Sequence, residues 1–320
     1  MSTAAASASE TARESWEWIR SNPLPAFFLA SLAATFVYFF NYLPLYAGLP
    51  IGPWAWARYK PEYNQEHSKL IPFVFVFLIW YHREALVQAR KAGSNWGLLV
   101  LALGIACYVV GARALQARLA LAGLPFLFTG VLLFLWGKQV ARILLFPSIF
   151  LVFLVPLGAI EQMSFRLQFI ITGAVQWLSG LVGIQIYAIG TTLRAVDGSW
   201  GFDIAEGCSG IRSLIAMVMI TAIYVHIVEK QLWKKVTIFG FSVIFAIIGN
   251  VGRIFTIIII AKLGFPGFAG GLYHDYSGFV FFPIALAAML GMSKLLSLRP
   301  EKVKEKVGTL SDRDTEKYDY

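Results

Sequence analysis

Long apolar runs, separated by short loops that carry Lys and Arg, constrain this chain more than any other feature of its sequence. Each run is close to the roughly 20 residues that an α-helix needs to cross a hydrocarbon core of about 30 Å. Of the 320 residues, 58% are hydrophobic and only 14% are charged, so much of the chain's surface must face lipid. The sequence therefore predicts an all-α polytopic membrane protein whose main surroundings are the lipid bilayer.

Eight of these runs are expected to cross the membrane as helices. They are Leu24–Leu43, 70–87, 96–113, 119–137, 143–160, 209–228, 236–262 and 277–297. One integral membrane domain, 23–298, is then flanked by a polar tail at 1–22 and by a charged tail at 299–320 that is expected to be disordered. A cleaved signal peptide is the alternative for the first run, but that run is long for the apolar part of such a peptide.

Two segments between the fifth and sixth runs differ from the others. In 161–183, charged and amide side chains interrupt an apolar stretch at helical spacing, which predicts an amphipathic helix at the membrane surface. In 184–206, β-branched residues alternate between glycines, and Asp197-Gly198 is a turn signal. A small extracytoplasmic hairpin is therefore expected just before Cys208.

The basic residues of the loops predict the orientation of the chain. They cluster in the first tail, in 82–91, in 138–142, in 230–235 and in the last tail, which are alternate connections if 161–183 does not cross. Because basic loops remain cytoplasmic, both termini are expected inside. Arg113 and Arg118 fall on the outer side and count mildly against this scheme. The net charge of +9 has a topological origin, and no nucleic-acid partner is expected.

This topology brings three chemically distinctive side chains to the outer surface. Cys208 precedes the sixth run, and His274 lies in a glycine-rich loop before the last run. Arg253 follows Lys235 by 18 residues, which is about 27 Å along a helix and near the outer end of the seventh run. Asn250 shares its helical face. Since ionisable groups in a span normally face protein, a common site at the outer face is predicted.

The sequence around Cys208 favours a reactive thiolate. Gly207-Cys208-Ser209-Gly210 stands at a helix start, where free N–H groups and the helix dipole stabilise an anion. Ser209 is the expected N-cap, and the main-chain amides there would receive an oxyanion. Arg212, four residues after the thiol, shares its helical face and would stabilise the thiolate or bind a carboxylate.

Three motifs in chain order resemble those of a known family. They are Cys208-Ser209-Gly210, Asn250-Val251-Gly252-Arg253 and His274-Asp275. Together they resemble the exosortase/archaeosortase family, in detail over about 140–297 and before that only by hydropathy and span count. The resemblance implies a cysteine peptidase or transpeptidase in the cytoplasmic membrane of a prokaryote. Its partners would be exported proteins with a C-terminal sorting tail of motif, transmembrane helix and basic end, such as the PEP-CTERM type.

The resemblance also implies the roles of the site residues. Cys208 would be the nucleophile, His274 the acid and base, and Arg253 the transition-state stabiliser. The thioester that forms would be resolved by water or by an amine, and the sequence does not separate these outcomes. The residues expected to support the site or bind substrate are Ser209, Gly210, Arg212, Asn250 and Asp275.

Non-catalytic roles compete with the catalytic ones for each residue type. A lone cysteine near a span is more often a packing residue, which is the interpretation adopted for Cys107. Arg253 would reach the interface by snorkelling in a protein without catalysis, and His67 or Asp275 rivals His274 as the acid and base. For the whole chain, a transporter or channel and a non-catalytic export scaffold are the alternatives.

No cofactor and no metal are expected. The four histidines are scattered, and no Cys, His or carboxylate pair has ligand spacing on one face. The glycines of 264–271 are not followed by the Lys-Ser/Thr of a nucleotide-binding loop. These glycines are instead expected to let His274 approach the thiol.

Overall fold

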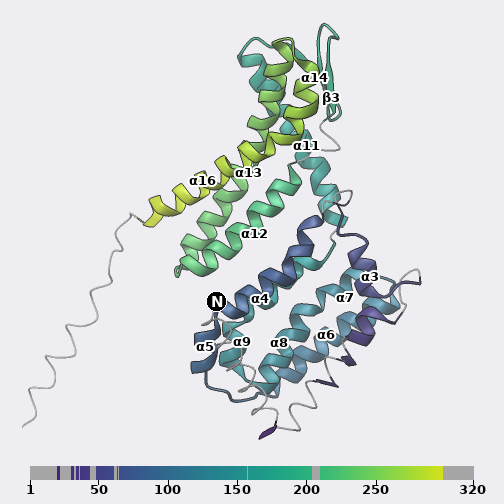
Figure 1. The fold of residues 1–320 in the computed structure, drawn as a ribbon, viewed down its shortest axis with the longest axis vertical. Helices are drawn as coiled ribbons and strands as arrows, with labels where there is room; N and C mark the ends of the chain where they lie inside the picture. The colour runs from purple at the N-terminus through teal and green to yellow at the C-terminus, as the bar shows by residue number, and fades with distance from the viewer. Residues whose placement is uncertain are drawn as a thin grey trace, which may run out of the picture. The chain divides into compact units, whose positions relative to one another are not determined.

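The described part of the chain forms two compact units, Met1–Ala159 and Ile160–Tyr320. Figure 1 shows the helices and strands of both. The computed structural model describes residues 20–21, 30–31, 34–35, 37–43, 48–60, 63, 65–156, 158–203 and 210–297, with the backbone alone for 158–165. The first tail apart from 20–21, the last tail and part of the expected first span therefore lie outside the described residues, as do Cys208 and Ser209.

Helices make up the described part of the first unit. In chain order they are α3 (Ile51–Trp56), the 3₁₀ helix η2 (Glu66–Leu70), α4 (Ile71–Tyr81), α5 (Arg83–Gln88), α6 (Trp96–Arg113), α7 (Ala117–Ala122), α8 (Leu124–Leu135), α9 (Lys138–Ile143), α10 (Leu145–Phe150) and the 3₁₀ helix η3 (Leu151–Leu154).

Buried glycines allow α6 to approach α7 and α8 closely. Gly97, Gly104 and Gly111 recur every seventh residue of α6, and all three are buried. A Cβ placed on Gly104 would lie 2.8 Å from the main-chain nitrogen of Leu127 in α8. Small residues at such a face let two backbones pack in lipid, where no hydrophobic effect drives helices together.

The second unit combines one sheet with helices. Its elements are α11 (Gly158–Leu181), β1 (Ile186–Ile189), β2 (Thr192–Ala195), β3 (Gly201–Asp203), α12 (Ile211–Val228), α13 (Leu232–Lys262), α14 (Pro266–Phe268), the π-helical turn η4 (Ala269–Tyr273), α15 (His274–Tyr276) and α16 (Gly278–Ser297).

The expected hairpin of 184–206 is present, and a third strand extends it. The sheet is antiparallel in the order β1-β2-β3, with Leu193 opposite Phe202. The predicted turn at Asp197 joins β2 to β3, where the Ser199 amide donates to the Asp197 carboxylate at 3.0 Å. Phe202 in turn packs on the segment before α16, since a Cβ on Gly270 would lie 2.7 Å from its ring.

Five helices of the described residues are long and apolar enough to cross a membrane. They are Trp96–Arg113, Ala117–Leu135 (α7 and α8 taken together), Ile211–Val228, Leu232–Lys262 and Gly278–Ser297. No more than 28% of the apolar window of each is buried inside the protein. An all-α membrane protein is thus confirmed, but the expected count of eight spans is not.

Two of the expected spans are broken into shorter helices. The run at 70–87 gives α4, which ends before His82 after 11 residues, or about 16 Å. The run at 143–160 gives α10 and η3, which together span Leu145–Leu154. The carbonyls freed at the end of η3 accept hydrogen bonds from Tyr59 Oη at 2.7 Å and Ser68 Oγ at 2.8 Å. The segment 161–183 is helical up to Leu181, where α11 ends, and its place at the membrane surface stays a prediction.

The core of the second unit lies between α12, α13 and α16 (Figure 1). Met217, Ala246 and Ala285 form one buried cluster. Small residues again permit the contact, because a Cβ on Gly252 would lie 3.2 Å from the Phe281 ring. The 31 residues of α13 measure about 46 Å, more than a hydrocarbon core of about 30 Å. This long helix carries Asn250 and Arg253.

Candidate active site

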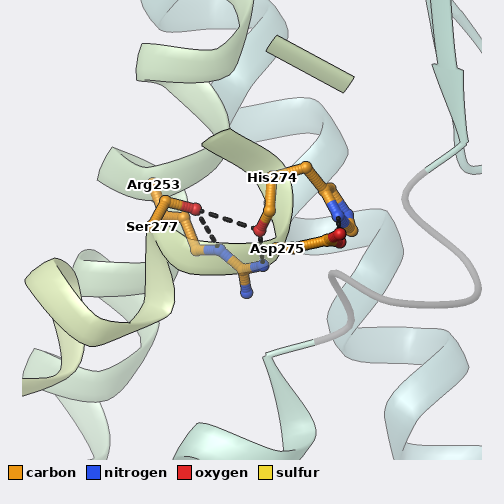
Figure 2. Close-up of polar contacts among 4 residues, drawn as sticks. All are labelled: Arg253, His274, Asp275 and Ser277. Carbon is orange, nitrogen blue, oxygen red and sulfur yellow. Dashed lines mark hydrogen bonds and ion pairs between the residues drawn. The ribbon is translucent and has the colours of Figure 1, made fainter. Parts of the chain in front are cut away.

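Arg253 is the centre of a hydrogen-bond network at the junction of α13 and α16. The side chain is half-buried. Its Nε donates to Ser277 Oγ at 2.9 Å, and its Nη2 donates to the main-chain oxygen of His274 at 2.7 Å. Ser277 Oγ donates to the same oxygen at 3.2 Å. Figure 2 shows the guanidinium lying along the 274–277 turn, with Nη1 directed away from it.

His274 is close to Arg253, but the contact is made by its main chain. Its imidazole Nδ1 lies 3.1 Å from Asp275 Oδ1, and the side chains of the two residues are 25% and 71% exposed. A carboxylate on one ring nitrogen leaves Nε2 as the nitrogen that would face a substrate. Asp275 therefore lies where an orienting partner of an imidazole would lie.

The glycine-rich segment before α16, expected to be a loop, has helical structure. It forms α14, η4 and α15, and only Gly271 has a non-helical backbone, with φ −102° and ψ −107°. Tyr273 Oη donates to Thr256 Oγ1 at 2.8 Å, and that hydroxyl donates to the Arg253 carbonyl at 2.8 Å. These bonds attach the segment to α13, which explains why its glycines do not leave it irregular.

Gly210 brings the start of α12 against Asn250. It is the N-cap residue of α12, so the expected N-cap at Ser209 is wrong by one position. Gly210 has φ +65°, a conformation in which a Cβ is unfavourable. A Cβ there would also lie 2.6 Å from Asn250 Cγ. The last residue of the Cys208-Ser209-Gly210 motif thus touches the Asn250 motif, whereas Cys208 and Ser209 lie outside the described residues.

Asn250, Arg253 and Ser213 line a small cavity between α12, α13 and α16. Gly249, Gly278 and Phe281 complete much of its wall. The space inside is about 10 Å³, which is about enough for one water molecule. Asn250 is 5% exposed, so its amide lies in this interior rather than in lipid. An Asn and an Arg three residues apart on one apolar helix are thus directed into the protein, as their spacing predicts.

Three other candidates are on elements that do not carry this network. Arg212 is exposed in the first turn of α12. Cys107 lies in α6, where its Cβ would be 3.1 Å from a Cβ on Gly123, as expected of a packing residue. His67 lies in η2 of the first unit. Within the described residues, no three His, Cys, Asp or Glu side chains gather where they would hold a metal ion.

Sequence patterns did not single out three hydroxyl residues of the network, Ser277, Tyr273 and Thr256. Thr256 carried a usable signal, because it lies three residues after Arg253 and so shares its helical face. Ser277 carried a weaker one, a hydroxyl at the start of an apolar run. Ser277 is 2% exposed and bonds two of the predicted site residues.

Comparison with known proteins adds one match. The family model described as transmembrane exosortase matches residues 56–291. This range runs from the last residue of α3 through most of α16, and therefore includes all the candidate residues of the second unit. Neither a curated protein nor a solved structure matches the chain.

Proposed function

Because the chain belongs to the transmembrane exosortase family, we propose that it is a membrane cysteine peptidase or transpeptidase. It would cut the C-terminal sorting tails of exported proteins, of the PEP-CTERM kind, at the outer face of a prokaryotic cytoplasmic membrane. The single observation that carries this proposal is the network that joins Arg253 to the main chain of His274. The contact between Gly210 and Asn250 adds support, since it draws the cysteine motif toward the same helix.

In the proposed reaction, Cys208 transfers its proton to His274 and its thiolate attacks the scissile carbonyl. The Arg253 guanidinium stabilises the oxyanion that forms. The carbon–nitrogen bond then breaks, and the imidazolium of His274 gives its proton to the leaving amine. A thioester remains between Cys208 and the shortened protein. Water or an acceptor amine attacks it, loses a proton and releases the thiol, which gives hydrolysis or transpeptidation.

The roles of the remaining groups follow from their positions. Asp275 would hold the His274 imidazole in one orientation. Asn250 would support the start of α12 through Gly210, and Arg212 would bind the substrate or stabilise the thiolate. The loop charges favour cytoplasmic termini and an outer site. A substrate that is itself anchored by a helix would enter from the bilayer, which gives a reason for a peptidase centre near the membrane surface.

The two cysteines provide a matched test. The reporter is an exported protein that carries the C-terminal tail of a sorted protein from the same organism, followed by gel and mass spectrometry. Cys208→Ala and Cys208→Ser are expected to abolish tail removal, and Cys107→Ala is expected to keep it. Hydroxylamine should release the reporter from a wild-type thioester but not from Cys208→Ala. Normal tail removal by Cys208→Ala would contradict the cysteine mechanism and favour the non-catalytic scaffold.

A further inference from the structure

Ser277 joins two residues of the proposed site through a single buried hydroxyl. This hydroxyl accepts from Arg253 Nε at 2.9 Å and donates to the His274 carbonyl at 3.2 Å. A serine hydroxyl has one donor hydrogen and two acceptor lone pairs, so it makes both bonds at once. With 2% of the residue exposed, water has little access to replace either bond. Ser277 therefore links the direction of Arg253 to the backbone of His274.

The geometry of arginine turns this link into a constraint on one particular atom. The guanidinium is planar, and its donors form a rigid fork. When Nε is fixed by Ser277 and Nη2 by the His274 carbonyl, the plane and the direction of Nη1 follow. Among the described residues, Nη1 has no hydrogen-bond partner, and it points away from the 274–277 turn (Figure 2). It is the part of Arg253 left to meet a substrate.

The segment that carries His274 needs such a restraint. Four glycines, at 264, 267, 270 and 271, precede His274, and glycine leaves the backbone more freedom than other residues. The Tyr273–Thr256 bond holds the segment on the N-terminal side of His274, and Ser277 holds it on the C-terminal side. The imidazole itself contacts Asp275, its exposed chain neighbour.

From these contacts we propose that Ser277 is a positioning residue of the active site. It fixes Arg253 so that Nη1 faces the developing oxyanion, and it holds the backbone of His274 at the distance that the proton transfers need. This inference rests on the proposed function, because it assigns Ser277 a part in that reaction. It makes the hydroxyl of Ser277, rather than its packing, the property that matters.

The test compares kinetic constants of purified variants in lipid vesicles that contain the tail-bearing reporter. Ser277→Ala is expected to lower kcat by about tenfold to a hundredfold, the order of loss caused by misplacing a catalytic group by about 1 Å. The KM for the reporter should stay nearly constant, since Ser277 does not touch substrate. Ser277→Thr keeps the hydroxyl and should recover most of kcat, whereas Ser277→Val has the same shape as the Thr variant and should not.

Ser293→Ala is the matched control. Ser293 is also on α16, is 1% exposed and bonds the Tyr224 hydroxyl at 3.0 Å, toward the opposite end of the helix. The variant removes a buried hydroxyl of the same helix and should leave kcat near wild type. Thermal unfolding of each variant separates loss of fold from loss of rate. If Ser277→Ala does not accumulate, the Thr and Val variants give the same comparison.

The outcomes separate this inference from the proposed function. The positioning role would be overturned if Ser277→Ala or Ser277→Val kept the wild-type kcat, or if Ser293→Ala lost as much kcat as Ser277→Ala. Either result leaves the proposed function standing as long as Cys208→Ala is inactive. Tail removal that persists in Cys208→Ala would overturn the proposed function itself. A selective loss of kcat in the Ala and Val variants, recovered in the Thr variant, is the result expected.

Discussion

The helix pair α6–α8 of the first unit and the pair α13–α16 of the second are both apolar, but different contacts hold them. In α6, the buried Gly97 and Gly104 bring its backbone against α8, and the contact depends on the fit of the two surfaces. In the second pair, the approach at Gly249 and Gly252 is looser, and Arg253 and Ser277 add hydrogen bonds at one end.

This difference separates what holds a membrane protein together from what gives it a site. Close packing of apolar surfaces stabilises a helix pair without fixing the direction of any polar group. A hydrogen bond requires a particular distance and angle, so the bonds of Arg253 fix the direction of one charged group. Removing a packing residue should therefore lower stability, and removing a network residue should lower the rate.

Arg253 should show the largest effect. Arg253→Ala is expected to lower the rate of tail removal by about 10² to 10³, the cost of one lost oxyanion donor. Arg253→Lys should fail as well, because an ammonium group keeps the charge but not the planar fork that reaches both Ser277 and His274. The rate is measured on the tail-bearing reporter, with Lys262→Ala, an exposed basic residue of the same helix, as the control. Wild-type activity in Arg253→Lys would show that the fork is unnecessary.

Gly104 tests the packing contact between α6 and α8, which should affect stability and not the rate. Gly104→Leu forces side-chain atoms into the Leu127 backbone and should destabilise the protein by about 1–3 kcal/mol. The rate per folded molecule should not change. Thermal unfolding in detergent gives the stability, and Gly240→Leu is the matched control because a Cβ there meets nothing within 4 Å. Equal unfolding temperatures for the two variants would contradict close packing at Gly104.

Gly210 is expected to affect both stability and rate, since its substitution strains the backbone and also displaces a site residue. Gly210→Ala and Gly198→Ala place a Cβ at φ +65° and φ +70°, and each should cost about 1–2 kcal/mol. Only Gly210→Ala pushes a Cβ into Asn250, whereas a Cβ on Gly198 meets nothing within 4 Å. Processing per folded molecule should thus fall in Gly210→Ala alone. Equal rates in both variants would separate Asn250 from the site.

Asp197 should show the smallest effect, confined to the sheet. Hydrogen bonds from Ser199 hold the pKa of the Asp197 carboxyl below its ordinary value of 3.8. A lowered pKa in the folded protein stabilises the fold above that ordinary value, and the stabilisation is lost as the pH falls through the folded pKa. Asp197→Ala should therefore lower the unfolding temperature slightly at pH 7, and by progressively less as the pH falls below 3.8. Ser199→Ala removes the bond from the hydroxyl and keeps the one from the main-chain amide. The losses should therefore overlap in the double variant, and fully additive losses would contradict this assignment.

Sequence patterns predicted the parts of the site that lie on one helix. Asn250 and Arg253 are three residues apart, and helical geometry alone places them on one face. Ser277 and Arg253 are 24 residues apart, and their bond depends on how α14, η4 and α15 reverse the chain between two helices. No periodicity carries that information, because the path follows from the bonds that hold each short turn.

Two of the expected spans are interrupted where the apolar sequence hid a break in the helix. The run at 70–87 is apolar enough to suggest one helix, but α4 ends before His82. In the run at 143–160, Pro147 and Pro156 were visible in the sequence, and proline interrupts the i to i−4 bonding of a helix. Hydropathy reports which residues tolerate lipid. It does not report whether consecutive residues continue one helix, since an apolar break can be completed by partners such as Tyr59 and Ser68.

The sequence by itself determined the helical, lipid-facing class of this protein, its exosortase motifs and the helix that carries Asn250 and Arg253. Composition decides the class, and residue order and helical spacing decide the motifs and the helix. None of these requires knowledge of a contact between distant residues. Only the tertiary structure decided that Gly210 lies against Asn250 and that two nitrogens of Arg253 bond Ser277 and His274. These contacts join separate elements of the chain, and their geometry exists only once α12, α13 and α16 have packed.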